Sequence, residues 1–127
     1  MIMSQIETSD QYFDLAFLFE IADGATEFIV ESIDMFLQQT PELMTTIYNA
    51  IQAKDAPVIA GAAHKLKPNL GFFGMHIAQA MMQELESMAK NGEDFTAIEA
   101  KYIAIRSILK PTLDKLKLIK AEKEKEI

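Results

Sequence analysis

The spacing of apolar residues constrains the fold more than any other feature of this 127-residue sequence. Apolar side chains recur every three or four positions along most of the chain, which is the period of an amphipathic helix. In the last long segment this stripe comprises Phe95, Ile98, Tyr102, Ile105, Leu109, Leu113 and Leu116. No segment alternates between apolar and polar residues as a half-buried strand does. The pattern predicts an all-α protein.

Turn-forming residues divide the chain into the segments that we expect to be helical. These segments are residues 10–22, 25–39, 56–70, 75–90 and 95–119. Thr40-Pro41 has the form of an N-cap followed by a first-turn proline, and the helical spacing then resumes as far as Ile51. The second segment is therefore either one long kinked helix or two stacked pieces. Ser9 or Asp10 is expected to cap the first helix, and Asp55 the helix that starts at residue 56.

Four substantial amphipathic helices joined by short loops pack most simply as an antiparallel up-and-down four-helix bundle. The short additional N-terminal helix would cover one end of this bundle. We expect a single domain over residues 1–127, with its core at about residues 10–118. The alternating charges of residues 119–127 predict a frayed tail, and Pro111 is expected to bend the last helix.

The composition disfavours several classes of function. A net charge of −7 weighs against nucleic acid and anionic membranes as partners, because both are negatively charged. The absence of cysteine excludes disulfides, thiol catalysis and Cys-based zinc sites. The N-terminus lacks the features of a signal peptide, and no apolar run approaches the length of a membrane span. We expect a soluble, cytoplasmic protein that is a monomer by default.

One histidine stands out in the segment IAGAAHKLKPNLGFF. At helical spacing, the core-facing stripe of this segment comprises Ile59, Ala62, Ala63, Leu66, Leu70 and Phe73. His64 falls on the opposite face, so we expect it to be exposed. Ala60 and Gly61 precede it by about one turn, and Pro68 and Gly71 follow. Because a glycine inside a helix costs about 1 kcal/mol relative to alanine, this pattern indicates close approach by another macromolecule.

His64 and Lys67 together suit the transfer of a phosphoryl group. A neutral imidazole is a good nucleophile near neutral pH, and one ring nitrogen attacks while the other holds the proton. Lys67 lies one turn further on and can offset charge on the phosphoryl oxygens. The alternative interpretation is an ordinary surface histidine beside a solvated lysine, and the small neighbours weigh against it without excluding it.

The run AHKLKPNLGFFGM resembles the signature of the histidine-containing phosphotransfer (HPt) domain family. In that signature the phosphorylated histidine is followed by a lysine three residues on and a glycine ten residues on, which His64, Lys67 and Gly74 match. The upstream run FLQQTPELMTTIYNAIQAKD and the downstream run MMQELESMAKNG resemble the neighbouring helices of the family. The likeness covers roughly residues 10–118.

The resemblance implies roles for three side chains. His64 would be the phosphoacceptor, through the ring nitrogen farther from the backbone, and Lys67 would stabilise the phosphoryl oxygens. Glu86 falls where many members carry a Gln or Glu that hydrogen-bonds the nearer ring nitrogen and orients the ring. From its place at the edge of an apolar stripe, Glu86 could equally be a solvated helix charge. Gln83, one turn earlier, is a weaker candidate for the same role.

Two positions depart from the family pattern. The family usually has glycine where this chain has Pro68, and a small residue where it has Asn69. Proline removes the amide that would bond the carbonyl of His64, and its ring crowds that turn of helix. We therefore expect a local kink just after His64, and a structural role for Asn69.

The resemblance also implies the partners. His64 would accept a phosphoryl group from an aspartate of one receiver domain and pass it to another, the receivers belonging to response regulators and hybrid histidine kinases. The receiver would supply Mg²⁺, so we expect no cofactor, metal or ATP-dependent kinase activity in this chain, which has no Gly-rich phosphate loop. The surface that docks the receiver would include Ala60, Gly61, Pro68, Gly71 and Phe72.

Three other interpretations compete with this one. A helical adaptor could keep the same fold and bind receiver or kinase domains without turnover. A di-iron bundle would need Glu three residues before its histidines, and neither His64 nor His76 has it. A lipid or cofactor pocket is suggested by methionines such as Met81, Met82 and Met88, but this spacing is more typical of core packing.

Overall fold

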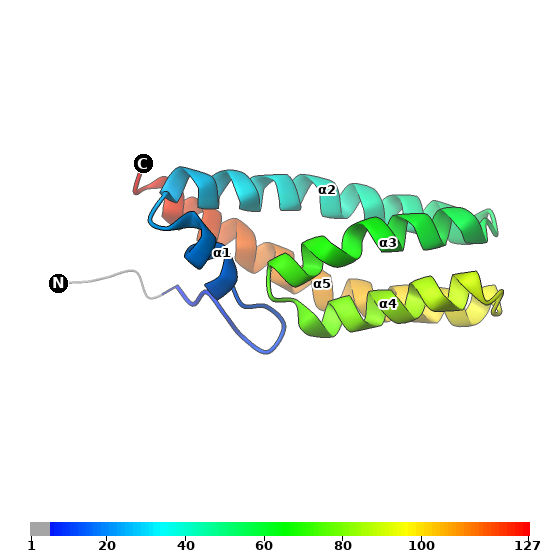
Figure 1. Ribbon diagram of the computed structural model, residues 1–127. Coiled ribbons are helices and arrows are strands. Elements are labelled where there is room, and N and C mark those ends of the chain that lie inside the picture. The colour runs from blue at the N-terminus through cyan, green and yellow to red at the C-terminus, as the bar shows by residue number, and fades with distance from the viewer. Residues whose placement is uncertain (1–5) are drawn as a thin grey trace.

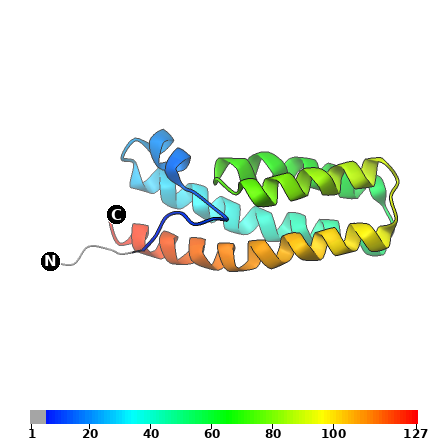
Figure 2. The same cartoon turned by 90° about the horizontal axis from the view of Figure 1, so that it is seen from below.

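A computed structural model, which describes residues 6–127, consists of five helices joined by short turns (Figure 1). The helices are α1 (Ala16–Ala22), α2 (Thr26–Gln52), α3 (Ala56–Phe72), α4 (His76–Lys90) and α5 (Phe95–Glu124). The last four run alternately up and down, and α3 and α4 form one layer against α2 and α5 (Figure 2). This arrangement confirms the prediction of an all-α bundle with a short N-terminal helix.

The core lies where the apolar stripes of the four long helices meet. Its side chains are almost completely removed from water, which is the main source of stability in such a bundle. The fully buried side chains of these helices include Ile33, Ile47, Ile59, Leu66, Leu70, Met82, Leu85 and Ile98. The core stripe expected around His64 is buried throughout, so the histidine helix has the orientation that its sequence predicts.

Two aspartates start long helices. The Asp55 carboxylate accepts a hydrogen bond from the amide of Val58 at 3.3 Å, which confirms it as the cap of α3. The Asp94 carboxylate accepts one from the amide of Thr96 at 3.1 Å and caps α5 in the same way. Each carboxylate satisfies an amide that the first turn of a helix leaves without a partner.

The first helix begins later than the sequence predicts, at Ala16 rather than at residue 10. The Asp10 carboxylate accepts from the amide of Tyr12 at 2.7 Å, and the Asp14 carboxylate accepts from the amide of Ala16 at 2.9 Å. These local bonds offer the backbone an alternative to the helical pattern. Residues 6–15 therefore lie outside the helix, and the expected cap at Ser9 or Asp10 is wrong.

The second long segment is one continuous helix, which selects the first of the two alternatives. Pro41 lies inside α2, and Thr40 is buried instead of capping a new helix. Similarly, α3 runs on past Pro68 to Phe72, and α5 contains Pro111. Three internal prolines are thus accommodated within helices of this bundle.

The C-terminal segment is more ordered than the expected frayed tail. Helix α5 extends to Glu124, and Ile119 is fully buried. The Lys120 ammonium lies 3.3 Å from the Asp34 carboxylate of α2 and 3.6 Å from that of Glu124. Burial and these ion pairs hold the last turns of α5 against α2.

The N-terminal segment packs against the turn between α3 and α4. The amide of Asp14 donates to the carbonyl of Phe73 at 3.2 Å. Gly74 follows with a φ of +67°, and a Cβ added there would lie 2.2 Å from the Asp14 carbonyl oxygen. Glycine is required at this position both for the backbone conformation and for the close approach of the N-terminal segment. Within residues 6–127, no helix has the length and apolar character needed to span a membrane.

Candidate functional site

His64 stands on the outer face of α3. Its side chain is 71% exposed, whereas its neighbours Ala63 and Leu66 are fully buried. The ring therefore projects into solvent from a rigid element, as expected. A rigid support and an accessible ring are the two properties that a nucleophile needs to react with another macromolecule.

Glu86 of α4 lies against the ring of His64. It is only 2% exposed, and its Oε2 lies 3.1 Å from Nδ1 of His64. A carboxylate accepts hydrogen bonds, so this contact favours the proton on Nδ1 and leaves the lone pair on Nε2, which points away from the backbone. The structure therefore places Glu86 against the ring, and the alternative of a solvated helix charge is wrong.

Lys67 is near His64 but faces the same carboxylate. Its Nζ lies 2.7 Å from Oε1 of Glu86, and the Lys67 side chain is only 18% exposed. It also donates a hydrogen bond to the side-chain oxygen of Gln83. Gln83, the weaker candidate for orienting the ring, therefore contacts Lys67 and not His64. In this state both contacts direct the Lys67 ammonium towards α4.

Lys90 completes the cluster and was not foreseen from the sequence. Its Nζ lies 2.8 Å from Oε2 of Glu86, the oxygen that also contacts His64. The signal that could have identified it is its position four residues after Glu86, because such residues are neighbours on a helix surface. The hydrogen bond from Lys67 has the largest effect on the pKa of Glu86, and that from Lys90 the next largest. Together they lower this pKa to about 2, although burial alone would raise it. Glu86 is therefore a carboxylate at neutral pH.

The residues expected to dock a partner are not equally accessible. Gly61 and Pro68 are exposed, while Gly71 and Phe72 are half-buried. Ala60 is only 8% exposed, so its expected place on the open surface is wrong, because it packs at the edge of the core. Asn69 is half-buried.

The two glycines of this helix differ in their surroundings. A Cβ added at Gly61 would meet no atom within 4 Å, so nothing inside the molecule requires glycine there. A Cβ added at Gly71 would lie 2.5 Å from Nε2 of Gln79. That same Nε2 donates to the Lys67 carbonyl at 3.2 Å, across from α4 to α3. Gly71 is thus explained by helix packing, and Gly61 is left as the position open to a partner.

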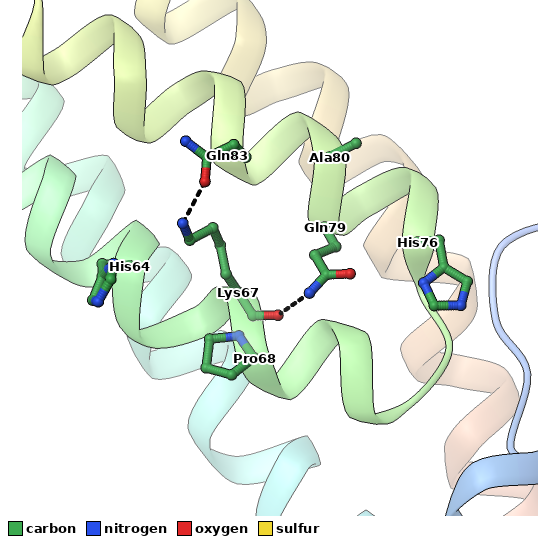
Figure 3. A pocket seen from close by; sticks show the side chains of 7 residues that line it. All are labelled: His64, Lys67, Pro68, His76, Gln79, Ala80 and Gln83. Atoms are coloured by element: carbon green, nitrogen blue, oxygen red, sulfur yellow. Dashed lines mark hydrogen bonds between the residues drawn. The ribbon is translucent and has the colours of Figure 1, made fainter.

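An open groove runs beside His64 between α3 and α4. It is lined by His64, Lys67, Pro68, His76, Gln79, Ala80 and Gln83, with the two histidines towards opposite ends (Figure 3). A second groove continues from Pro68 and Gln79 to Phe17 of α1 and Phe72 of α3. The rings of Phe17 and Phe72 meet edge to face at 5.4 Å, and Phe17 remains 51% exposed. The groove beside His64 therefore adjoins an exposed aromatic surface formed by Phe17 and Phe72.

Metal-binding groups do not gather in the part of the chain that the structure describes. Within residues 6–127, no three His, Asp or Glu side chains lie close enough together to hold a metal ion. Glu86, the acidic group beside His64, is already paired with two lysines.

Comparison with known proteins places the chain among signalling domains. The sequence model of the Hpt domain matches residues 31–108, which is more than half of the chain. The chain is also similar to the phosphorelay intermediate protein rdeA of Dictyostelium discoideum, with 26% identity over 86 residues. This similarity covers 68% of the chain and 34% of rdeA, so the chain matches about a third of that relative's length. No solved structure matches significantly.

Proposed function

The chain belongs to the Hpt domain family, and we propose that His64 is the residue that carries the phosphoryl group in a histidine–aspartate relay. The observation that supports this best is the exposed imidazole whose Nδ1 lies 3.1 Å from a buried carboxylate. This arrangement leaves Nε2 as a nucleophile directed at solvent.

The proposed step exchanges one bond to phosphorus for another. The Nε2 lone pair attacks the phosphorus of an aspartyl phosphate on a receiver domain. The new P–N bond forms as the P–O bond to the aspartate breaks, and the aspartate leaves as a carboxylate. The Nδ1 proton stays in its hydrogen bond to Glu86. The reverse reaction on a second receiver returns His64 to its initial state.

Lys67 is proposed to stabilise the phosphoryl oxygens. It lies one turn beyond His64 on α3, and its ammonium is already within the same charge cluster. A cation at this place offsets negative charge that develops on the phosphoryl group during transfer. The acidic pocket and Mg²⁺ are assigned to the receiver, so the chain itself contributes no nucleotide or metal.

The receiver is proposed to cover a docking face formed by Phe17, Gly61, Pro68 and Phe72 around His64. The open space at Gly61 and the exposed ring of Phe17 support this choice. An aromatic surface beside a reactive group is typical of the centre of a protein interface. Response regulators and hybrid histidine kinases are the proposed sources of the receivers, with the chain acting as a cytoplasmic monomer.

Labelling with phosphorylated receiver domains tests this proposal. The wild-type chain should acquire a phosphate that is labile in acid and stable in base, and His64→Gln should acquire none. His76→Gln, which removes the chain's other histidine, should still acquire the acid-labile phosphate. Labelling of His64→Gln would contradict the assignment. Binding of receivers without any labelling of the wild type would indicate the non-catalytic adaptor instead.

A further inference from the structure

Lys90 has no role in the step described above, although it is part of the charge cluster. The two oxygens of Glu86 serve three groups: Oε2 contacts His64 and Lys90, and Oε1 contacts Lys67. The unphosphorylated cluster thus contains one carboxylate and two ammonium groups around a ring that is neutral when it reacts. Two cations are more than a single carboxylate needs for neutrality.

Phosphorylation changes this balance. A phosphoryl group on Nε2 of His64 adds about two negative charges beside the cluster. Lys67 lies on the same helix as His64, and its ammonium now faces Glu86 and Gln83 of α4. To serve the phosphoryl oxygens, it would turn from these partners towards His64. Its departure removes the cation from Oε1 at the moment when the local negative charge increases.

Glu86 would then be poorly compensated if Lys67 were its only partner. A carboxylate that is 2% exposed is costly to leave without a cation, and more so next to another anion. Such a carboxylate would take up a proton or turn away, and in either case it would release the Nδ1 proton of His64. The orientation of the ring would be lost during the transfer.

Lys90 is placed to prevent this loss. It extends from α4, the helix of Glu86, and not from α3, so it does not depend on the movement of Lys67. Its contact is with Oε2, the oxygen that holds His64. Its side chain is 62% exposed and has room to remain in contact as the cluster rearranges.

We propose that Lys90 is a positioning residue that keeps Glu86 ionised and directed at Nδ1 of His64 while Lys67 turns to the phosphoryl group. The two lysines thus have separate tasks, one at the phosphoryl oxygens and one at the carboxylate. This inference rests on the proposed function of His64 as the phosphoacceptor.

The test uses phosphoramidate as the phosphoryl donor, so that no receiver has to dock. Nε2 of His64 attacks the phosphorus, the bond between phosphorus and the amide nitrogen breaks, and ammonia leaves. The rate of phosphohistidine formation is followed by phosphorus NMR. Lys90→Met should slow this rate about 10-fold, by analogy with the loss of other groups that orient a reacting histidine. Lys90→Arg should restore it to within about two-fold, because the cation returns.

The matched control is Lys65→Met, which removes an exposed lysine next to His64 in sequence. Its rate should stay within about two-fold of wild type, since a solvated charge has little influence on its surroundings. The inference is overturned if Lys90→Met is phosphorylated at the wild-type rate. It is also overturned if Lys90→Arg is as slow as Lys90→Met, or if Lys65→Met loses as much rate as Lys90→Met. In all three results the wild type is still labelled on His64, so the proposed function stands. If phosphoramidate and phosphorylated receivers both leave wild-type His64 unlabelled, the proposed function and this inference fall together.

Discussion

At the scale of single residues, the sequence predicts the exposure of His64 better than the contacts of the charged residues around it. The exposure of His64 follows from the helical phase of its own segment, which the sequence contains in full. The pairing of Lys67 with Glu86 depends on how far α4 is shifted along α3, and no periodicity reveals that shift. Lys90 lies four residues after Glu86 on the same helix, so their contact was visible in the sequence. The importance of Lys90 was missed because the burial of Glu86 was not visible there.

The lowered pKa of Glu86 predicts a specific dependence of stability on pH. Its pKa is about 2 in the folded protein and 4.5 as the reference value, so the folded state binds fewer protons between these limits. Stability should therefore rise with pH in this window. The contribution is fully present above about pH 4.5 and is lost as the pH falls through about 2. Urea unfolding at a series of pH values measures it.

Glu86→Gln is the control for this pH dependence. The variant has no carboxyl group at this position, so its free energy of unfolding should fall less steeply than that of wild type below about pH 4.5. Parallel curves for the two proteins would show that other carboxyl groups determine acid stability.

Substitutions of Gly61 distinguish the docking of a receiver from the reactivity of His64. Gly61→Gln should slow phosphoryl uptake from a receiver about 10-fold, because a long side chain intrudes on the docking face. Uptake from phosphoramidate should be unchanged, since a Cβ at this position meets no atom within 4 Å. Gly61→Ala is the matched control, with a small effect on either donor. Equal slowing with both donors would contradict a docking role.

At the scale of helices, packing overrides local preference. Pro68, where the sequence predicts a kink, does not end α3, which continues to Phe72 with Leu66 and Leu70 fully buried on either side. The apolar face holds the helix together although one backbone hydrogen bond is missing. The helices themselves were predictable from their stripes, whereas the start of α1 was not. Local hydrogen bonds to the Asp10 and Asp14 carboxylates replace its first turn, and the backbone of Asp14 is held in addition by the distant Phe73.

The internal proline of α3 should be a source of instability. Pro68→Ala restores an amide that can donate to the carbonyl of His64, and it should raise the free energy of unfolding by about 1–3 kcal/mol. Pro68 is exposed, so the substitution leaves no cavity. Urea denaturation measures the change, with Pro111→Ala in α5 as a second exposed internal proline for comparison. A loss of stability in Pro68→Ala would show that the proline is adapted to its site.

At the scale of the whole molecule, the N-terminal segment and the site helix are physically joined. Asp14 bonds to Phe73 at the end of α3, and Phe17 packs against Phe72. The long-range contact of Asp14 with Gly74 could not be predicted from sequence, because glycine in a turn already has a local explanation. The bundle itself could be predicted, since four amphipathic helices with short connections leave few alternatives.

Substitutions of two glycines test this contact between the N-terminal segment and the end of α3. Gly74→Ala should lower the free energy of unfolding by at least about 3 kcal/mol, because it combines an unfavourable backbone with a clash. That clash is with the Asp14 carbonyl oxygen, which would lie 2.2 Å from the new Cβ. Gly92→Ala is the control, since its φ of +69° is nearly the same but its Cβ would meet nothing within 4 Å. Gly92→Ala should lower the free energy of unfolding by only about 1 kcal/mol. Similar losses in Gly74→Ala and Gly92→Ala, measured by thermal or urea unfolding, would argue against the clash.

The position of Phe17 has a consequence for signalling fidelity. The match to the family's sequence model spans residues 31–108, whereas Phe17 lies before it and lines the groove that adjoins the one beside His64. Paralogues could therefore share the same phosphotransfer chemistry and still be insulated from one another's circuits. Exchange of the segment before α2 between such proteins would change which receivers they recognise, while the residues around His64 stay the same.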